Sequence, residues 1–384
     1  MASATRLPLK SLTFTALVLI GAGASRVNLR NVLVNTFTGP GSYSRIVAIA
    51  VVLANVKNFP WAWHYRVFQG ILKHCLFSIP QFPATTSKPS TLFLPVITTS
   101  HSPFTECDYN LHKSNSTYFS DLDVTRSHLV CCLLQPGIDK LHKNQKHKLV
   151  LDKEGKAVKG AWGIMLGAVA CSFKREIKPF ERYEMWSRLL CWDRKWIYVV
   201  THFVKAGTVR PESYILGDGS WFGTKYGLKK GAKSAKDGAE DVDQKFVFAT
   251  AISKYVVKLG RLTVHPEVLI EAAGMLPSRP GGWTSMSSLS AANEPKPELE
   301  FLSRENGSVD GSITGAENGT ANGHANGNAN GSATSADKWD WERVEAQNER
   351  GLKFAEHFAA LDGLHGEFAG SKQPALGRYR DFLL

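Results

Sequence analysis

The sequence predicts an α+β domain in which one antiparallel sheet wraps around a single helix. Two observations support this fold class. One helical segment near residues 114–129 is followed along the chain by four strand-like segments between residues 162 and 257. Two of these segments are joined by a tight turn, and strands joined in that way pair antiparallel. A lone amphipathic helix must bury its apolar face, and the sheet provides that cover.

The helix is predicted from the spacing of its apolar residues. Positions four, three and four residues apart share one helical face, and here they are occupied by Tyr118, Leu122, Thr125 and Leu129. Ser114 and Asn115 lie directly before this stripe, and both residue types are good helix N-caps. A shorter strand-like segment, residues 91–99, precedes the helix and is expected to join the same sheet.

The strands are predicted from a change to a period of two. Residues 162–173 form an apolar run rich in Gly and Ala, which is typical of a strand buried on both faces. Residues 181–192 alternate, and the side chains expected on one face are Tyr183, Met185, Leu189 and Cys191. A turn at 193–195 leads back along a strand at 196–204, and 246–257 adds another strand.

Composition divides the chain into four regions: 1–80, 81–284, 285–337 and 338–384. The first region is apolar, and the second is the predicted domain, interrupted by a Gly-, Lys- and Asp-rich insertion at 217–243. The third is rich in Asn, Gly, Ala and Ser, buries too little apolar surface to fold, and is expected to be disordered. The fourth begins with an amphipathic helix near Trp341 and ends in a tail.

The N-terminal region has two interpretations. A basic start, the apolar residues 12–20 and a small-residue exit at 22–24 resemble a secretory signal, although the apolar part is too short to span a bilayer. A second apolar run, 46–56, is followed by an aromatic cluster at 60–65 of the kind found at membrane interfaces. Either residues 1–80 contact a membrane surface, or they form buried helices of an N-terminal subdomain.

Overall composition excludes several classes of protein. Hydrophobic residues make up 43% of the 384 residues and charged residues 21%, which excludes a fully disordered or collagen-like chain. Six cysteines without a CxxC pair indicate neither a disulfide scaffold nor a zinc site, so we expect a reduced intracellular protein without a metal or cofactor. If the N-terminus contacts a membrane, the endoplasmic reticulum or another internal membrane is the expected location.

The net charge of +12 is compatible with an anionic partner, either a nucleic acid, an anionic membrane face or a phosphorylated ligand, and also with lysines in solvated loops. The basic residues are scattered, and the sequence contains no helix-turn-helix, zinc-finger or RNA-binding aromatic signature, so a nucleic acid is not expected. A phosphorylated ligand such as coenzyme A remains compatible with this charge.

Residues 108–118 read Asp-Tyr-Asn-Leu-His-Lys-Ser-Asn-Ser-Thr-Tyr. This segment resembles the signature of hot-dog acyl-thioesterases, in which an Asp begins the motif and a His and an Asn-Asn pair precede a helix bearing a Tyr. The matching positions are Asp108, His112, Asn115 and Tyr118, whereas Ser114 replaces the first Asn. A wider resemblance, over residues 55–260 and the C-terminal helix, is to the thioesterase superfamily member 6 group and its fungal relatives in secondary-metabolite clusters.

The resemblance implies a hot-dog fold and hydrolysis of an acyl-CoA or acyl-carrier-protein thioester in lipid or secondary metabolism. The residues themselves suit this chemistry. A carboxylate at Asp108 can activate water or attack the thioester carbon. N–H groups at the helix start, from Ser114 to Thr117, can stabilise the oxyanion, while His112 or Asn115 can orient the water or the carbonyl.

Five further residues are candidates for substrate binding: Ser114, Ser116, Tyr118, Lys174 and Arg175. The two basic residues end a predicted strand and can pair with coenzyme A phosphates. Several of the candidate catalytic and substrate-binding residues also have a structural interpretation. Asp108 followed by Asn110 is typical of an Asx turn, Tyr118 can pack in the core, and the basic pair can be a solvated strand end.

Two functional hypotheses therefore stand: a thioester hydrolase, and a non-catalytic acyl-binding or membrane-associated hot-dog protein. A hot-dog dehydratase is disfavoured by the spacing of Asp108 and His112. The outer face of the sheet, expected to carry Trp186, Leu190 and Trp192, needs cover. We expect a homodimer through that face, unless the N-terminal segment or the C-terminal helix covers it.

Overall fold

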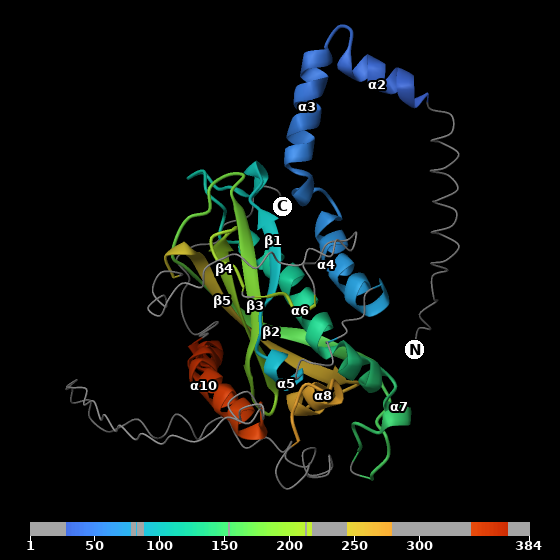
Figure 1. The fold of residues 1–384 in the computed structure, drawn as a ribbon, viewed down its shortest axis with the longest axis vertical. Helices are drawn as coiled ribbons and strands as arrows, with labels where there is room; N and C mark the ends of the chain where they lie inside the picture. The colour runs from blue at the N-terminus through green and yellow to red at the C-terminus, as the bar shows by residue number, and fades with distance from the viewer. Residues whose placement is uncertain are drawn as a thin grey trace, which may run out of the picture.

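The computed structural model describes residues 28–77, 82, 88–152, 154–211, 213–216, 244–278 and 339–367. The expectations for the insertion at 217–243 and for the linker at 285–337 lie outside the described residues, as does the signal-like segment before residue 28. Within the described ranges an antiparallel sheet curves around helix α6 (Thr117–His142), which is the arrangement of the hot-dog fold (Figure 1). The predicted fold class is confirmed.

The strands are β1 (Val96–His101), β2 (Trp162–Phe173), β3 (Arg182–Trp192), β4 (Trp196–Lys205), β5 (Val247–Leu259) and β6 (Leu262–Val264). The sheet order is β1-β3-β4-β5-β2, with β6 paired to β5, and all pairs are antiparallel. In the β3–β4 turn, Asp193 Oδ1 accepts the N–H groups of Lys195 and Trp196 at 2.7 and 2.6 Å. The predicted hairpin is therefore present.

The longer helices are α2 (Leu29–Phe37), α3 (Ser42–Ala54), α4 (Ala62–Leu72) and α10 (Trp341–Ala359). Short α-helical turns are α5 (Lys88–Thr91), α7 (Asn144–His147) and α8 (Pro266–Ala272). The 3-10 turns are η1 (Val56–Asn58), η3 (Phe104–Glu106), η5 (Gln244–Phe246) and η7 (Ala360–Glu367), and η2 (Lys73–Phe77) is a π-helical turn.

The inner face of the sheet packs against α6. The predicted stripe of Tyr118, Leu122, Thr125 and Leu129 is buried, as expected. Tyr118 and Leu122 contact a cluster formed by Tyr183, Met185 and Phe203 of the sheet. The helix begins later than predicted, with Ser116 rather than Ser114 or Asn115 at the N-cap position. Ser114 lies in the preceding loop, where its N–H donates to Glu106 O at 2.8 Å.

A β-bulge in β3 changes which residues face α6. The register with β4 shifts between Leu189 and Cys191, so the strict alternation breaks there. Cys191 joins Leu190 on the outer face, whereas Trp192 faces inward and donates from Nε1 to Glu267 Oε1 at 3.2 Å. The predicted faces of Cys191 and Trp192 were therefore wrong, because one inserted residue inverts the pattern beyond it.

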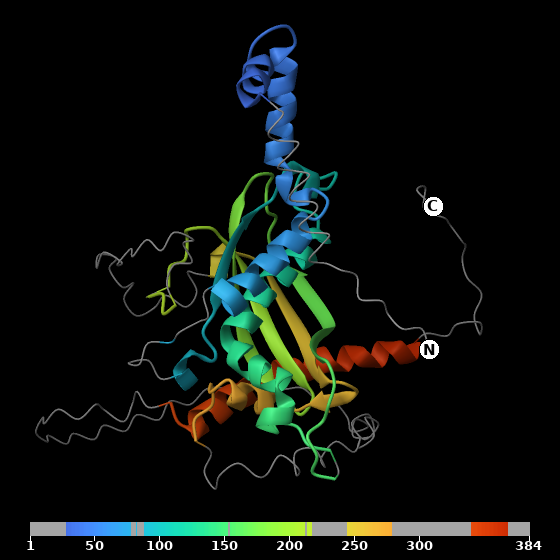
Figure 2. The ribbon, with the colours of Figure 1, turned by 90° about the vertical axis from the view of Figure 1, so that its right-hand side faces the viewer.

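The outer face of the sheet is covered by α10, which lies on the side opposite α6 (Figure 2). Ala355 and Phe358 of this helix pack against Leu190 and its outer-face neighbours. The approach is close at Gly351, where an added Cβ would lie 2.5 Å from Leu190 O. The C-terminal helix thus covers the surface that was expected to form the dimer interface.

Strand β2 is an edge strand and not a strand buried on both faces. The described strands pair with only one side of it. Several of its apolar side chains are exposed: Trp162, Met165, Leu166 and Phe173. The prediction of a strand buried on both faces was wrong because it rested on composition. An apolar strand has the same composition at the edge of a sheet as in its middle.

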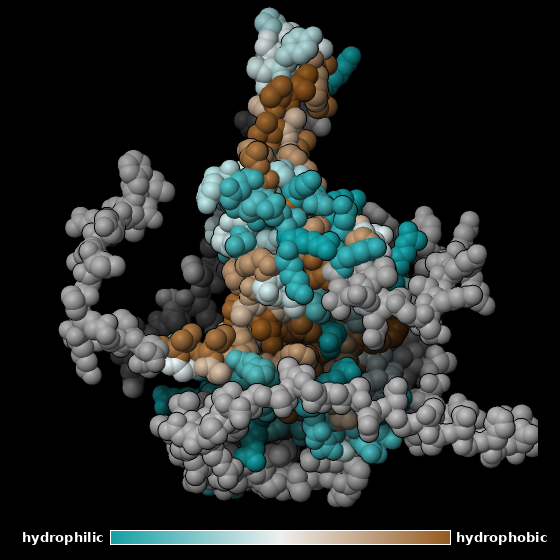
Figure 3. Space-filling view, turned by 90° about the vertical axis from the view of Figure 1, so that its left-hand side faces the viewer, coloured by the Kyte–Doolittle hydropathy of each residue, from teal (hydrophilic) through white to brown (hydrophobic). Residues whose placement is uncertain are grey.

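The N-terminal helices divide into a packed and a projecting part. α4 packs on α6, whereas α2 and α3 extend away from the body of the protein (Figures 1 and 2). None of the residues of α3 is buried, and apolar side chains dominate its surface (Figure 3). Among the described helices no single one is long and apolar enough to cross a membrane, although the pair α2–α3, bent by 105°, passes the same test of length and composition together.

Candidate active site

The motif residues form a tight loop between η3 and α6. Cys107 and Lys113 pair as an isolated antiparallel bridge that closes the loop. Inside it, the Asp108 N–H donates to His112 O at 2.9 Å and the Leu111 N–H donates to Asp108 O at 3.0 Å. Leu111 has a φ of 59°, the left-handed conformation that lets so short a loop reverse direction. This geometry brings Asp108 and His112 to the same side of the loop.

The two oxygens of the Asp108 carboxylate have different partners. Oδ1 accepts the Asn110 N–H at 2.9 Å, so the Asx turn is present. Oδ2 lies 3.4 Å from Nδ1 of His112, whose Nε2 lies 3.7 Å from Glu176 Oε1. The Asp108 and His112 side chains are 24% and 22% exposed. Asp108 therefore serves as a turn residue and also presents a solvent-accessible carboxylate beside an imidazole.

The start of α6 offers few free backbone N–H groups that could bind an oxyanion. Ser114 and Thr117 use their N–H groups, the latter donating to Ser114 O at 3.0 Å. In the part of the chain that the structure describes, the N–H groups of Asn115 and Ser116 have no backbone acceptor, and both residues are exposed. These two N–H groups are the candidate oxyanion donors. The Ser114 and Ser116 hydroxyls lie 3.1 Å apart.

Tyr118 lies in the core and not at the loop surface. It is 2% exposed and its ring contacts Phe173 and Phe203, with centroids 5.0 and 4.8 Å away. Burial raises the pKa of its phenol. The position of Tyr118 agrees with its structural interpretation as a core residue. Its side chain does not lie with the other candidate substrate contacts.

The basic residues Lys174 and Arg175 lie beside the loop. Both N–H groups donate to Phe248 O, at 2.8 and 3.0 Å, and both side chains are exposed. The Arg175 guanidinium also contacts Lys245 O. Glu176 follows directly and faces His112, while the Lys113 N–H donates to Ile177 O at 2.8 Å. The end of β2 thus brings Glu176 against His112, and the two cations directly precede Glu176 in the chain.

Behind the loop lies a buried ionic cluster that sequence reasoning missed. It consists of Lys57, Glu106, Lys113, Asp121 and Tyr183. Lys113 Nζ lies 2.5 Å from Glu106 Oε2 and 3.0 Å from Asp121 Oδ2, and Lys57 Nζ lies 2.9 Å from Glu106 Oε2 and 3.0 Å from Asp121 Oδ1. The Tyr183 hydroxyl donates to Asp121 Oδ2. Glu106 and Lys113 thereby clamp the two ends of the loop.

The charges in the cluster determine its protonation. Burial on its own would raise the pKa of Asp121, but Lys57, Lys113 and Arg66 outweigh burial and hold that pKa well below its usual range. Arg66, from α4, lies 2.6 Å from Asp121 Oδ1. Burial lowers the pKa of Lys57, and Asp121 opposes this effect. Asp121 is thus a buried carboxylate that stays ionised and ties the loop, α6 and α4 together.

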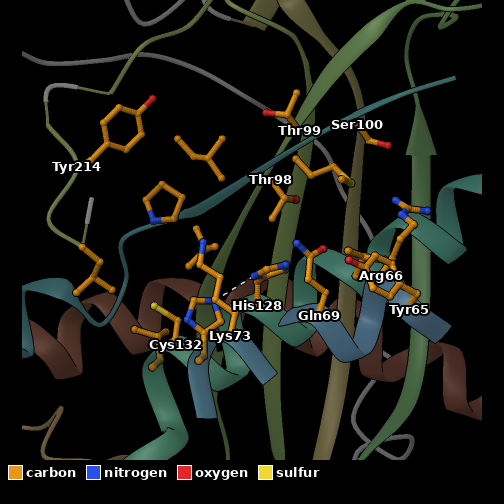
Figure 4. Close-up of a pocket in the computed structure, with 18 of the residues that line it drawn as sticks. Tyr65, Arg66, Gln69, Lys73, Thr98, Thr99, Ser100, His128, Cys132 and Tyr214 are labelled. Atoms are coloured by element: carbon orange, nitrogen blue, oxygen red, sulfur yellow. Dashed lines mark hydrogen bonds between the residues drawn. The ribbon is translucent and has the colours of Figure 1, made fainter. Parts of the chain in front are cut away.

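A cavity of about 1490 Å³ lies between α4, β1 and α6 (Figure 4). Neither Asp108 nor His112 borders it. His74 Nε2 and His128 Nδ1 lie 3.0 Å apart in its wall, and burial lowers the pKa of both rings to about 4. Among the described residues no group of three or more His, Cys, Asp or Glu side chains is arranged to hold a metal ion.

Comparison with known proteins defines the class. The sequence model of the thioesterase-like superfamily matches residues 102–220, which include the Asp108 loop. The thioesterase poxG of Penicillium oxalicum is 32% identical over 343 residues, 87% of this chain and 89% of the relative. The probable thioesterase atnL of Emericella nidulans is 31% identical over 351 residues, 90% and 92% of the two chains. Among solved structures, a gentisyl-coenzyme A thioesterase aligns with 13% identity and a TM-score of 0.27, over 47% of this chain and 99% of the other.

The chain therefore belongs to the thioesterase-like superfamily. The resemblance drawn from residues 108–118 is confirmed, and so is the predicted class of enzyme, a thioester hydrolase.

Proposed function

We propose that this protein hydrolyses the thioester of an acyl-CoA or an acyl carrier protein at the Asp108 loop, in lipid or secondary metabolism. One observation carries the proposal: a solvent-accessible carboxylate, with its Oδ2 3.4 Å from the His112 imidazole, lies in the loop that precedes the central helix of a thioesterase-like fold. The relatives that match over most of this chain carry the name thioesterase, which supports the same reaction.

The reaction requires a base and an oxyanion site. Asp108 either takes a proton from water, which then attacks the thioester carbon, or attacks that carbon itself to form an anhydride that water cleaves. In both routes the carbon–sulfur bond breaks and the thiolate leaves, taking up a proton to give the free thiol. The N–H groups of Asn115 and Ser116 are the proposed donors to the developing oxyanion, where one such donor contributes roughly 2.7–4 kcal/mol. His112 orients the carboxylate and the water.

Recognition of the thiol half of the substrate is assigned to Lys174 and Arg175. Both coenzyme A and the prosthetic arm of a carrier protein bear phosphate at the end of the pantetheine chain opposite the reacting thiol. The two cations directly precede Glu176, which faces His112, and their exposed side chains are available to pair with this phosphate when the pantetheine chain lies along the protein surface.

A homodimer through the β2 edge is part of the proposal. The covered outer face no longer supports the interface expected from sequence. Strand β2 instead combines an open sheet edge with the exposed side chains of Met165, Leu166 and Phe173, which are 53%, 44% and 39% exposed. Pairing of two such edges would bury this apolar surface close to the Lys174–Glu176 segment.

Contact with a membrane surface through α2 and α3 is also part of the proposal. The two helices carry exposed apolar side chains such as Val47, Val51 and Leu53, which are 61%, 58% and 65% exposed. Within α2–α3 the charged residues are Arg30 and Arg45, so an apolar surface is available for insertion into an interface. We propose an intracellular membrane, such as the endoplasmic reticulum, as the location.

The proposed reaction is tested by following free thiol release from short, long and aromatic acyl-CoAs and from the same acyl groups on a carrier protein. Wild-type protein is expected to release thiol from part of this panel, and Asp108→Asn is expected to lose that release while keeping ligand binding. Binding without release by wild-type protein would contradict hydrolysis and identify a non-catalytic acyl-binding protein instead.

A further inference from the structure

The cavity between α4, β1 and α6 is separate from the Asp108 loop and has no role in the proposed reaction. Its volume of about 1490 Å³ exceeds the roughly 300–1,000 Å³ of most small-molecule pockets. One wall is α4, which lies outside the sheet and its central helix. The cavity therefore has room for an extended ligand at a site that neither Asp108 nor His112 borders.

Part of the wall is apolar. The side chains that form this part come from β1, β3 and α6 and include Val96, Met185, Val124 and Leu133. Phe59 and Trp61 border the cavity as well, and they follow closely after the exposed helix α3. A long alkyl chain is the kind of group that such a lining takes up, because its burial removes apolar surface from water.

The polar part of the wall lies on one face of α4 and continues to the first residue of η2. Arg66, Gln69 and Lys73 are spaced three and four residues apart, and Figure 4 shows their side chains along the cavity, with Thr98 across from them on β1. Thr98 Oγ1 is buried and has no hydrogen-bond partner among the described residues. A ligand head group here meets two cations and a hydroxyl that needs a partner.

The charge of the wall has one sign. Lys57, Arg66 and Lys73 border the cavity, and among its described lining residues there is no Asp or Glu. Lys57 and Arg66 also pair with the buried Asp121, which is not among the lining residues. An anionic head group is therefore attracted to the α4 wall without opposition from a lining carboxylate.

We propose that this cavity binds an amphipathic ligand with one long alkyl chain and an anionic head group, the chemistry shared by a fatty acid and an alkyl phosphate. The chain lies against Val96, Val124 and Leu133, and the head group pairs with Lys73 and Arg66 and accepts a hydrogen bond from Thr98. This site goes beyond the proposed hydrolysis, since it contains none of the residues assigned to that reaction.

The test uses the full-length protein and displacement of a fluorescent fatty acid by three competitors of equal chain length: palmitate, hexadecyl phosphate and hexadecanol. Both anions are expected to displace the probe, with hexadecanol at least tenfold weaker. The stronger of the two anions distinguishes a fatty acid from a phosphate lipid. Equal displacement by hexadecanol and the anions, or no binding of the probe, would overturn the proposal.

Variants then locate the binding. Lys73→Gln removes the head-group charge and Thr98→Phe fills the cavity, and each is expected to weaken displacement by palmitate roughly tenfold or more. Lys143→Gln directly after α6 is the matched control and should leave it unchanged. If Lys73→Gln and Thr98→Phe both bind palmitate as tightly as wild-type protein, the probe binds elsewhere and the proposal is wrong.

Two further checks separate this proposal from others. Circular dichroism confirms that each variant is folded, and Lys73→Gln suffices if Thr98→Phe does not fold. Asp108→Asn is expected to bind palmitate as tightly as wild-type protein. Failure of the cavity proposal therefore appears in displacement, whereas failure of the hydrolysis proposal appears in thiol release.

Discussion

Two systems of acid–base pairs lie at the same end of α6, and they differ in burial. Asp108 and His112 are 24% and 22% exposed and lie 3.4 Å apart. Asp121 and Lys113 are fully buried and lie 3.0 Å apart, within a cluster that also holds Glu106 and Lys57. The exposed pair can meet a substrate but contributes little to folding, whereas the buried cluster cannot meet a substrate but fixes the loop that presents the exposed pair. The residues that can react with a substrate and the residues that stabilise the loop are therefore different, although they lie within one short segment of the chain.

The largest effect is expected from breaking the buried cluster. Asp121→Ala leaves Lys57 and Lys113 short of a counter-charge in a low-dielectric site, and such a loss costs about 3–5 kcal/mol. The matched control is Asp139→Ala on the same helix, where an exposed Asp lies 3.7 Å from Lys143; its cost is about 0.5 kcal/mol or less. Urea unfolding measures both changes.

Equal losses in Asp121→Ala and Asp139→Ala would contradict the contrast between the buried and the exposed pairs. A loss of stability in Asp121→Ala together with an ordered, fully active loop would contradict the supporting role of the cluster.

An intermediate effect is expected from pH. The pKa values of His74 and His128 fall from about 6.5 in the unfolded chain to about 4 in the folded protein, so the unfolded state binds more protons between these values. Stability should therefore decrease as the pH falls from 6.5 towards 4, by about 2 kcal/mol after allowance for the partial exposure of both rings. Asp121, whose folded pKa is depressed, adds its own loss only below about pH 4.

Urea unfolding of His128→Gln at several pH values checks this prediction. The slope between pH 6.5 and 4 should become shallower, while the exposed His147→Gln on α7 keeps the wild-type slope. An unchanged slope in His128→Gln would show that the acid sensitivity in this range arises elsewhere.

Local patterns in the sequence predicted the elements and the loop well. Tyr118 and Leu122 share a helical face because the helical repeat is fixed by the backbone, and the strands of the β3–β4 hairpin pair because a three-residue turn connects them. The motif at residues 108–118 located Asp108 and His112, because loop residues next to a helix start are close in sequence as well as in space.

Features that depend on distant residues could not be predicted in the same way. Lys57 meets Asp121 across 64 positions, and nothing in the residues around Lys57 marks it as buried. The bulge at Leu189 inverted the faces of Cys191 and Trp192, and the order of strands decided that β2 is an edge. One signal was present, since Glu106 and Lys113 carry opposite charges at the two ends of the Asp108 loop.

The central claim is that Asp108 supplies chemistry and not stability. Asp108→Asn keeps a side-chain oxygen for the Asn110 N–H but removes the carboxylate, so its free energy of unfolding should change by about 0.5 kcal/mol or less. The measurement is its rate of thiol release from the best acyl thioester, alongside its unfolding curve. We predict a loss of roughly 100-fold or more with stability unchanged. Release at the wild-type rate by folded Asp108→Asn would contradict the account.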